Sequence, residues 1–448
     1  MKLHCKYCMR FTMKIRNNYG AVFRNSEGQK PTIHMKKIIF FACVFTCCFL
    51  AANAQSEGLT GSPYSMYGLG IINQANVGKY NALGHGGIAM PGNSGINNLN
   101  PASYASIFDK SFFFDVGFRA EYNHYSNKIN DEDKWSFNFS NLAFAFSLSK
   151  KSGIGVTLTP YTNVGYTLLG VTSNIEGSDQ EFESTINGSG GLNDVKINYS
   201  YLLSDKIRIG VNASYLFGSI KENEFFYIGS SYFDMNETSF YHGVRLGLGF
   251  QYDILKNFSV GGTVQLPVSL DGSMDRTVTK TLDGTSVTVE DEEGENISDF
   301  KLPTELGVGI YFTPFKGFSV NADYKRNFWS STSQTDNIGQ YEDQDIFSMG
   351  VEYMKNARSL EYIDRVQFRG GFTSDNGYLS INHKKVGGYA ITAGLGLPLN
   401  TNTNSMLNIS YSYGQKGQLS NILIKENYHF ITLNISLEDL WFIKRKYD

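Results

Sequence analysis

The sequence predicts an all-β protein: a transmembrane antiparallel β-barrel of about fourteen strands with an N-terminal plug (hatch) segment in its lumen. Three observations support this fold class. An export signal precedes the mature chain, and segments of about ten residues alternate apolar with polar or small side chains from residue 111 onward. No second apolar run in the 448 residues is long enough for a membrane-spanning helix.

Residues 35–54 are predicted to be a cleaved signal peptide. Two lysines follow Met35, an apolar stretch comes next, and Ala52–Ala54 (Ala-Asn-Ala) is a small-x-small cleavage site. Residues 1–34 are polar, basic and without pattern. We interpret them as a mis-assigned, non-native extension and exclude them from the fold.

Cysteine and charge exclude several classes of function. Every cysteine precedes the predicted cut, so the mature chain has no disulfide and no thiol chemistry: Cys5, Cys8, Cys43, Cys47 and Cys48. Lipidation at Cys47 or Cys48 is the alternative, although Val44-Phe45-Thr46 is a poor lipidation site. The net charge of -3 has no basic excess that would indicate a nucleic-acid partner.

Residues 55–110 and 111–448 differ in character. The first segment is rich in Gly, Asn, Ser and Pro with little alternation, and we predict that it is the plug. The second segment is predicted to form the barrel wall.

Four stretches of the predicted wall alternate most clearly. In one of them Val244, Leu246, Leu248, Phe250 and Tyr252 share a face, opposite Arg245, Gly247, Gly249 and Gln251. Stretches that start at Val195, Ile207 and Ile431 repeat the pattern. A soluble β-sandwich has the same period. Strand length, outward Tyr and Phe, and export favour the barrel.

The turns set the strand number. Short polar turns fall near residues 150–153, 204–206, 253–257, 313–317, 355–358 and 398–404, and longer stretches, expected as external loops, at 123–134, 173–187, 271–299 and 327–342. Six short periplasmic turns, with both chain ends in the periplasm, imply fourteen strands. Because so wide a barrel would leave an open lumen, we place residues 55–110 inside it.

Short motifs add a family resemblance. The plug contains Gly84–Met90 (GHGGIAM) and then Asn100-Pro101-Ala102, shortly before the first strand. Further pieces are Ser62–Gly70 (SPYSMYGLG), Gly191–Val195 (GLNDV), Leu302–Gly309 (LPTELGVG) and Trp441–Tyr447 (WFIKRKY). Across nearly the whole mature chain this organisation resembles the FadL-type outer-membrane transporters, in their Bacteroidetes branch. The resemblance implies a fourteen-stranded barrel whose hatch is anchored to the wall by an Asn-Pro-Ala motif. Taken alone, Asn100-Pro101 is also an ordinary turn.

The resemblance also implies that a solute leaves sideways through the wall, which requires an interrupted ladder. Pro160 interrupts a strand-like run and cannot donate to the ladder. With Asn163 and Gly165 it forms the predicted wall opening. A bulge near the barrel rim is the alternative.

Other candidate sites are weak. His85, in the glycine-rich part of the plug, is a candidate contact for a lumen ligand or a polar plug residue without such a role. The acidic run Glu290–Glu295 lacks calcium-loop spacing and is interpreted as an external loop. The sequence contains no HExxH, GxSxG or Walker motif, and we expect no metal, cofactor or enzymatic activity.

Two main hypotheses of function follow. The first is passive uptake of hydrophobic small molecules, fatty-acid- or hydrocarbon-like, across the outer membrane of a Gram-negative bacterium, in contact with outer-membrane lipid. The second is an interaction or shuttle component of a protein secretion system, with envelope proteins as partners. A barrel enzyme is a third reading, which would need a Ser/His/acid cluster on the outer face.

Overall fold

The computed structural model describes residues 60–440, except 75, 175–180, 336–338, 402 and 420–422. They belong to the unit Gln55–Asp448, while Met1–Ala54 is a separate unit. The predicted extension (1–34) and signal peptide (35–54) lie outside the described residues.

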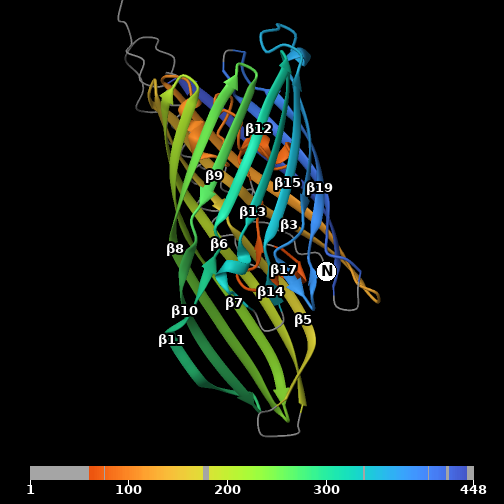
Figure 1. The fold of residues 1–448 in the computed structure, drawn as a ribbon. Coiled ribbons are helices and arrows are strands. Elements are labelled where there is room, and N and C mark those ends of the chain that lie inside the picture. The colour runs from red at the N-terminus through yellow and green to blue at the C-terminus, as the bar shows by residue number, and fades with distance from the viewer. Residues whose placement is uncertain are drawn as a thin grey trace, which may run out of the picture. The chain divides into compact units, whose positions relative to one another are not determined.

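A single antiparallel sheet of eighteen segments forms the barrel (Figure 1). One segment, β1 (Ile71–Ile72), comes from the plug, and three wall strands are each split in two, so the wall has fourteen strands. It closes because β21 pairs with β2 from Ser111↔Leu440 to Ser126↔Lys425. The predicted closed barrel is confirmed. The wall segments are β2 (Ser111–Ser126), β3 (Asp131–Ser149), β4 (Ser152–Pro160), β5 (Thr162–Asn174), β6 (Glu181–Ser204), β7 (Ile207–Ile228), β8 (Ser231–Leu255), β9 (Phe258–Gln265), β10 (Val268–Leu282), β11 (Thr285–Leu302), β12 (Glu305–Phe315), β13 (Phe318–Asn327), β15 (Gln344–Met354), β16 (Gln367–Asp375), β19 (Gly388–Pro398), β20 (Met406–Lys416) and β21 (Lys425–Leu440).

The predicted faces are also confirmed. In β8, Leu246 and Leu248 are 52% and 53% exposed, whereas Arg245 and Gln251 are 4% and 0% exposed. Successive strand residues point to opposite faces, so the apolar set meets lipid and the polar set faces the lumen.

Proline lies at each of the three places where a wall strand is split. β4 ends at Pro160, β9 and β10 are separated by Leu266 and Pro267, and β11 and β12 by Pro303 and Thr304. Proline has no N–H to give to a ladder, so a strand that contains it is interrupted there.

Several hairpins are longer than expected. β6, β7 and β8 have 24, 22 and 25 residues, about twice the roughly 9–11 that cross a membrane. The expected loops at 123–134 and 271–299 are wrong, because the β2–β3 and β10–β11 ladders continue through them. Outside the membrane both strand faces meet water, so the apolar alternation that marks a strand is lost.

Apart from the turns 229–230 and 283–284, which close two of the long hairpins, the short connections lie at the opposite end of the barrel. Four of them are two-residue turns, at 150–151, 205–206, 256–257 and 316–317. The connection after β15 is longer than expected and contains η5 (Ile363–Arg365). Because outer-membrane barrels have short periplasmic turns, we assign this end to the periplasm and the long hairpins to the exterior.

The N-terminal segment fills the lumen with short elements: η1 (Pro63–Met66), β1, η2 (Gly78–Ala82) and η3 (Pro101–Ser106). Val77, Ile96 and Tyr104 of this segment pack against inward Ala143 and Ala145 of β3. The smaller elements η4 (Trp329–Thr332), β14 (Gly339–Tyr341), β17 (Leu379–Ile381) and β18 (Lys384–Lys385) belong to external connections. Within residues 60–440, as far as they are described, no helix is long and apolar enough to span a membrane.

Candidate functional site

Asn100 connects the plug to the wall through its side chain. It is the N-cap of η3, where its Oδ1 accepts a hydrogen bond from the amide of Ala102 at 3.0 Å. Its Nδ2 donates to the carbonyl of Ile88 at 2.8 Å and to that of Phe250 in β8 at 3.0 Å. The side chain is completely buried. The Asn100, Pro101 and Ala102 motif therefore lies at a plug–wall contact.

Two glycines make room for this motif. Gly210 of β7 and Gly249 of β8 are directly opposite each other in the ladder. A Cβ atom on Gly249 would collide with the Oδ1 of Asn100, and one on Gly210 would collide with the amide of Ala102. The alternation placed Gly249 on the water-facing side of its strand but gave no reason for a glycine there.

A second glycine pair does the same on another part of the wall. Gly350 of β15 and Gly371 of β16 are opposite each other, and a Cβ on either would collide with the main chain of Leu83 or Gly84. The plug backbone thus rests directly on wall backbone at separate points around the lumen.

Buried charges add further ties. The Asp323 carboxylate in β13 accepts hydrogen bonds from the amides of Gly87 and Ile88, the second at 3.0 Å. Glu352 of β15 lies 3.3 Å from Lys79 of the plug and 2.7 Å from Arg369 of β16. Sequence reasoning missed these residues; the available signal was a charged side chain at an inward position of an apolar-alternating strand.

His85 lies in the middle of the lumen. It lines two neighbouring cavities, of about 190 and about 200 Å³, and its Nδ1 is 3.2 Å from the Nδ2 of Asn76. Burial lowers the pKa of His85 to about 3, and the positive charges of Arg119 and Lys325 act in the same direction. The imidazole is therefore neutral at physiological pH.

The wall is interrupted beside Pro160. The β3–β4 ladder ends at the pair Leu142↔Leu158. Beyond it, β5 pairs with β6 on one side and, among the described residues, only with the plug strand β1 on the other, through Ile71↔Asn163 and Ile72↔Thr162. The three residues of the predicted opening thus sit where β3 and β5 separate.

The plug covers this interruption. The hydroxyl of Ser65 accepts from the amide of Gly165 at 3.0 Å and donates to its carbonyl at 3.1 Å. On the β3 side, Lys134 donates to the carbonyl of Thr60 at 3.1 Å. Both Asn163 and Gly165 are consequently bonded to the N-terminal segment.

The apolar part of the lumen is already occupied. Leu69 of the plug is 4% exposed and packs in a cluster with Phe300, Trp329 and Tyr341, against which Tyr378 also lies. The space left in the cluster is about 10 Å³, about what one water molecule needs.

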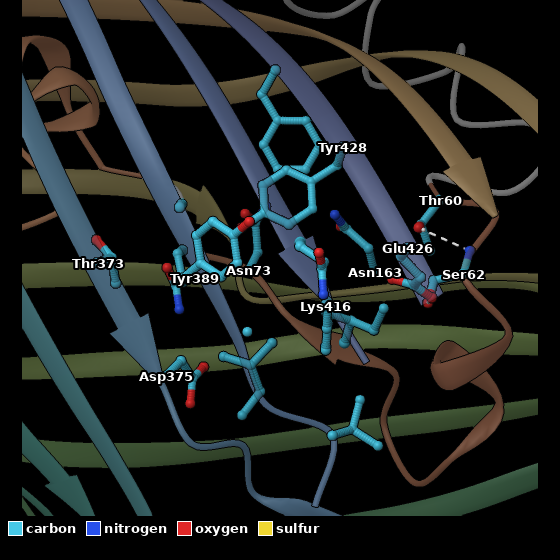
Figure 2. Close-up of a pocket in the computed structure, with 18 of the residues that line it drawn as sticks. Thr60, Ser62, Asn73, Asn163, Thr373, Asp375, Tyr389, Lys416, Glu426 and Tyr428 are labelled. Atoms are coloured by element: carbon cyan, nitrogen blue, oxygen red, sulfur yellow. Dashed lines mark hydrogen bonds between the residues drawn. The ribbon is translucent and has the colours of Figure 1, made fainter. Parts of the chain in front are cut away.

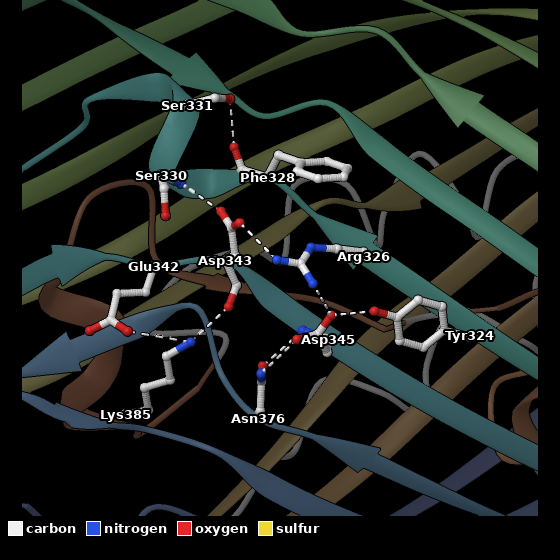
Figure 3. Close-up of polar contacts among 10 residues, drawn as sticks. All are labelled: Tyr324, Arg326, Phe328, Ser330, Ser331, Glu342, Asp343, Asp345, Asn376 and Lys385. Carbon is white, nitrogen blue, oxygen red and sulfur yellow. Dashed lines mark hydrogen bonds and ion pairs between the residues drawn. The ribbon is translucent and has the colours of Figure 1, made fainter.

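A charged network holds the external connection that carries Trp329 and Tyr341 (Figure 3). The guanidinium of Arg326 lies 3.2 Å from Asp343 and 3.4 Å from Asp345. Asp343 also accepts from the amide of Ser330 at 3.0 Å. Both aromatic side chains are therefore fixed over Leu69.

The cavity of about 190 Å³ has a mixed lining of polar and apolar side chains (Figure 2). Asp375, Lys416 and Glu426 border it together with Tyr389 and Tyr428. Ile71, Val386 and Phe430 also border it, so the lining offers apolar as well as polar surface. In the described residues no group of three or more His, Cys, Asp or Glu side chains could hold a metal ion.

Solved structures share this fold. The Ralstonia pickettii toluene transporter TbuX aligns with a TM-score of 0.53 and 18% identity over 81% of this chain and 98% of its own. The Pseudomonas putida toluene transporter TodX gives 0.53 and 15% over 87% and 100%, and a Pseudomonas aeruginosa FadL homologue gives 0.53 and 11% over 82% and 98%. At such identities the likeness shows the fold alone. No curated protein matches the chain.

The fold and a family model together place the protein. It is an outer-membrane β-barrel of the Gram-negative type with a FadL-like architecture, so the expected resemblance holds for the fold. The family model of BamG matches residues 34–448, which is most of the sequence. The chain therefore belongs to the BamG family.

Proposed function

We propose that this protein is an interaction component of the outer-membrane BAM machinery and that its barrel works in the closed state. The observation that carries the proposal is that the plug closes the interruption in the wall, because Ser65 and β1 of the plug are hydrogen-bonded to β5. Membership of the BamG family supports the partner, since the family name refers to that machinery.

The energy of plug attachment also supports a closed barrel. About a dozen hydrogen bonds join residues 79–100 to the wall. At a net value of about 1 kcal/mol each, release of this segment would cost on the order of 10 kcal/mol. Such a cost makes an emptied lumen too rare to serve as a route for solute.

A disulfide lock tests the proposal. Ile71 and Asn163 are ladder partners, and directly opposed antiparallel residues lie about 4.5–5.5 Å apart, within disulfide range. The predicted mature chain has no cysteine, so Ile71→Cys/Asn163→Cys would create one defined bond. We expect the oxidised variant and the wild type to co-purify with BAM components equally. Each single-cysteine variant is the control, and a wild type that recovers no BAM component would contradict the proposal.

A second candidate function is passive uptake of a hydrophobic solute with lateral exit. It is favoured by the separation of β3 from β5 at Pro160 and by the cavity of about 190 Å³ that borders Asn163. Toluene entry into proteoliposomes distinguishes the two. Uptake that the wild type accelerates, the oxidised lock abolishes and a reductant restores would support this second function.

A further inference from the structure

The long external strands form an open sheet beyond the barrel, which we call the distal sheet. It contains β5, β10 and β11 with residues 181–192 of β6, 218–228 of β7 and 231–241 of β8, paired in the order β5–β6–β7–β8–β10–β11. Figure 1 shows these yellow and green strands running well past the ends of the blue strands. In the described part of the chain β11 pairs only with β10, so this edge is open.

In the described residues both faces are uncovered over the outer part of the distal sheet, beyond Leu192, Leu270 and Phe300, which are buried in the cluster around Leu69. Within the membrane, β7 and β8 alternate between buried and exposed residues. In the distal sheet this alternation stops, and residues 222–226 of β7 and 232–239 of β8 are all partly exposed. An antiparallel sheet ordinarily packs one face on a core. The distal sheet therefore has two faces available to a partner.

Aromatic side chains form a row on each face. On one face Phe226 stacks on Phe233 at 5.1 Å between ring centroids, and Phe182 lies 4.7 Å from Phe226. On the other face Tyr232 lies 5.1 Å from Tyr227 and 6.3 Å from Phe225. Partly exposed aromatic residues are the side chains most enriched as anchors of protein interfaces.

The same sheet is strongly acidic. With its turns 229–230 and 283–284 it carries fifteen carboxylates and four Lys or Arg side chains, a net charge of -11, whereas the whole chain has -3. One of the four, Arg276, is already paired with Glu237 and Glu290. A charge of one sign on a projecting surface attracts a partner of the opposite sign.

We propose that the distal sheet is the docking surface for an external protein segment that is rich in Lys and Arg and carries apolar side chains. The aromatic rows would anchor its apolar groups, and the carboxylates would pair with its cations. This inference rests on the proposed function, for which it names the surface and the partner chemistry. A second copy of the chain fits poorly, because two surfaces of charge -11 repel each other.

Affinity purification of tagged full-length protein from native envelopes, with BAM components quantified by mass spectrometry, tests the inference. The charge variant is Glu292→Lys/Glu293→Lys, at two exposed β11 positions. Its matched control is Asp131→Lys/Glu132→Lys, which makes the same charge change at exposed positions of the β2–β3 hairpin. Gel mobility with and without heating verifies that each barrel is folded.

An aromatic variant examines the anchors separately. Phe226→Ala/Phe233→Ala removes one row without touching the barrel wall. We expect recovery of BAM components to fall roughly tenfold or more in the aromatic variant, because the loss of an aromatic anchor has an effect of that size at protein interfaces. Recovery should also fall in the charge variant, whereas the matched control should keep the recovery of the wild type. Photo-crosslinking from a benzoylphenylalanine at position 226 should reach the same component, whereas the lipid-facing position 248 should not.

The outcomes separate the two proposals. Equal recovery with all variants would overturn the docking surface and leave the proposed function standing. Recovery of nothing by the wild type would overturn the proposed function itself. Equal losses of BAM components with the charge variant and its matched control would show that only the overall charge matters, and would overturn the docking surface. Wild-type protein that recovers BAM components only when calcium is added would assign the carboxylates to a cation, and would also overturn it.

Discussion

Replacing Asn100 by alanine should loosen the plug while the barrel stays folded. The substitution removes two hydrogen bonds to the wall, from the Nδ2 of Asn100 to the carbonyls of Phe250 at 3.0 Å and Gly262 at 3.4 Å, and two bonds within the plug, from the amide of Ala102 and to the carbonyl of Ile88. Only the two wall bonds hold the plug to the barrel, and at about 1 kcal/mol each their loss should lower the docking free energy by about 2 kcal/mol. That corresponds to roughly a 30-fold rise in the population of the detached plug.

Hydrogen exchange of the protein in detergent measures this population. Amides of residues 84–106 should exchange roughly 30-fold faster in Asn100→Ala, while the amides of the wall strands remain protected. Asn97→Ala is the matched control. Asn97 is equally buried, but it donates to Gly87 and Met90 and accepts from the Leu99 amide, all within the plug.

Two results would refute the reasoning. One is unchanged exchange, or unchanged protease resistance, of the plug in Asn100→Ala. The other is equal acceleration at η3 in Asn97→Ala, which would show that internal plug order rather than the bond to Phe250 controls docking.

Three further predictions concern other plug contacts. Gly249→Ala should weaken plug docking by about 1–3 kcal/mol through overpacking, whereas Gly370→Ala, whose Cβ would meet nothing closer than 3.8 Å, should leave plug exchange unchanged. Lys79→Met should leave the partly buried Glu352 with one cation instead of two and cost the plug about 1–3 kcal/mol, measured by protease resistance. His85 has a pKa of about 3 in the folded protein against 6.5 when free. Below pH 6.5 the imidazole therefore takes up a proton when the plug leaves the wall and exposes it to water. Plug stability is then complete above pH 6.5 and declines towards pH 3 by at most about 1.4 kcal/mol per pH unit. In His85→Gln the difference in plug protection factor (the exchange rate relative to that of a free amide) between pH 7.5 and pH 5 should become smaller, and an unchanged difference would assign it to other groups.

The strands inside the membrane were predictable from the sequence because their signal is local. The residues of the stretch from Val244 to Tyr252 meet lipid and lumen alternately, and a period of two records that difference residue by residue. Residues 271–299, which form most of β10 and β11, were expected as a loop. There water contacts both faces, so the sequence of β11 has no reason to alternate.

The Asn100-Pro101-Ala102 motif was recognised, but its setting was not. Its wall partners Gly210 and Gly249 follow more than one hundred residues later, and each reads locally as an ordinary small residue of a strand. Likewise Pro160 indicated an interrupted strand, whereas only the assembled lumen shows that Ser65 and Ile71 occupy the interruption.

From the sequence alone we could predict the closed barrel, the number of strands and the faces of the alternating strands. The export signal was also predicted from the sequence. These depend on composition and on spacing within ten residues. Only the tertiary structure decided how the plug is held, that Leu69 fills the aromatic cluster and that an acidic sheet with two open faces extends outside the membrane. These features depend on which distant residues meet when the ladder closes, since a hydrogen bond or a steric fit between strands leaves no period in either strand's sequence.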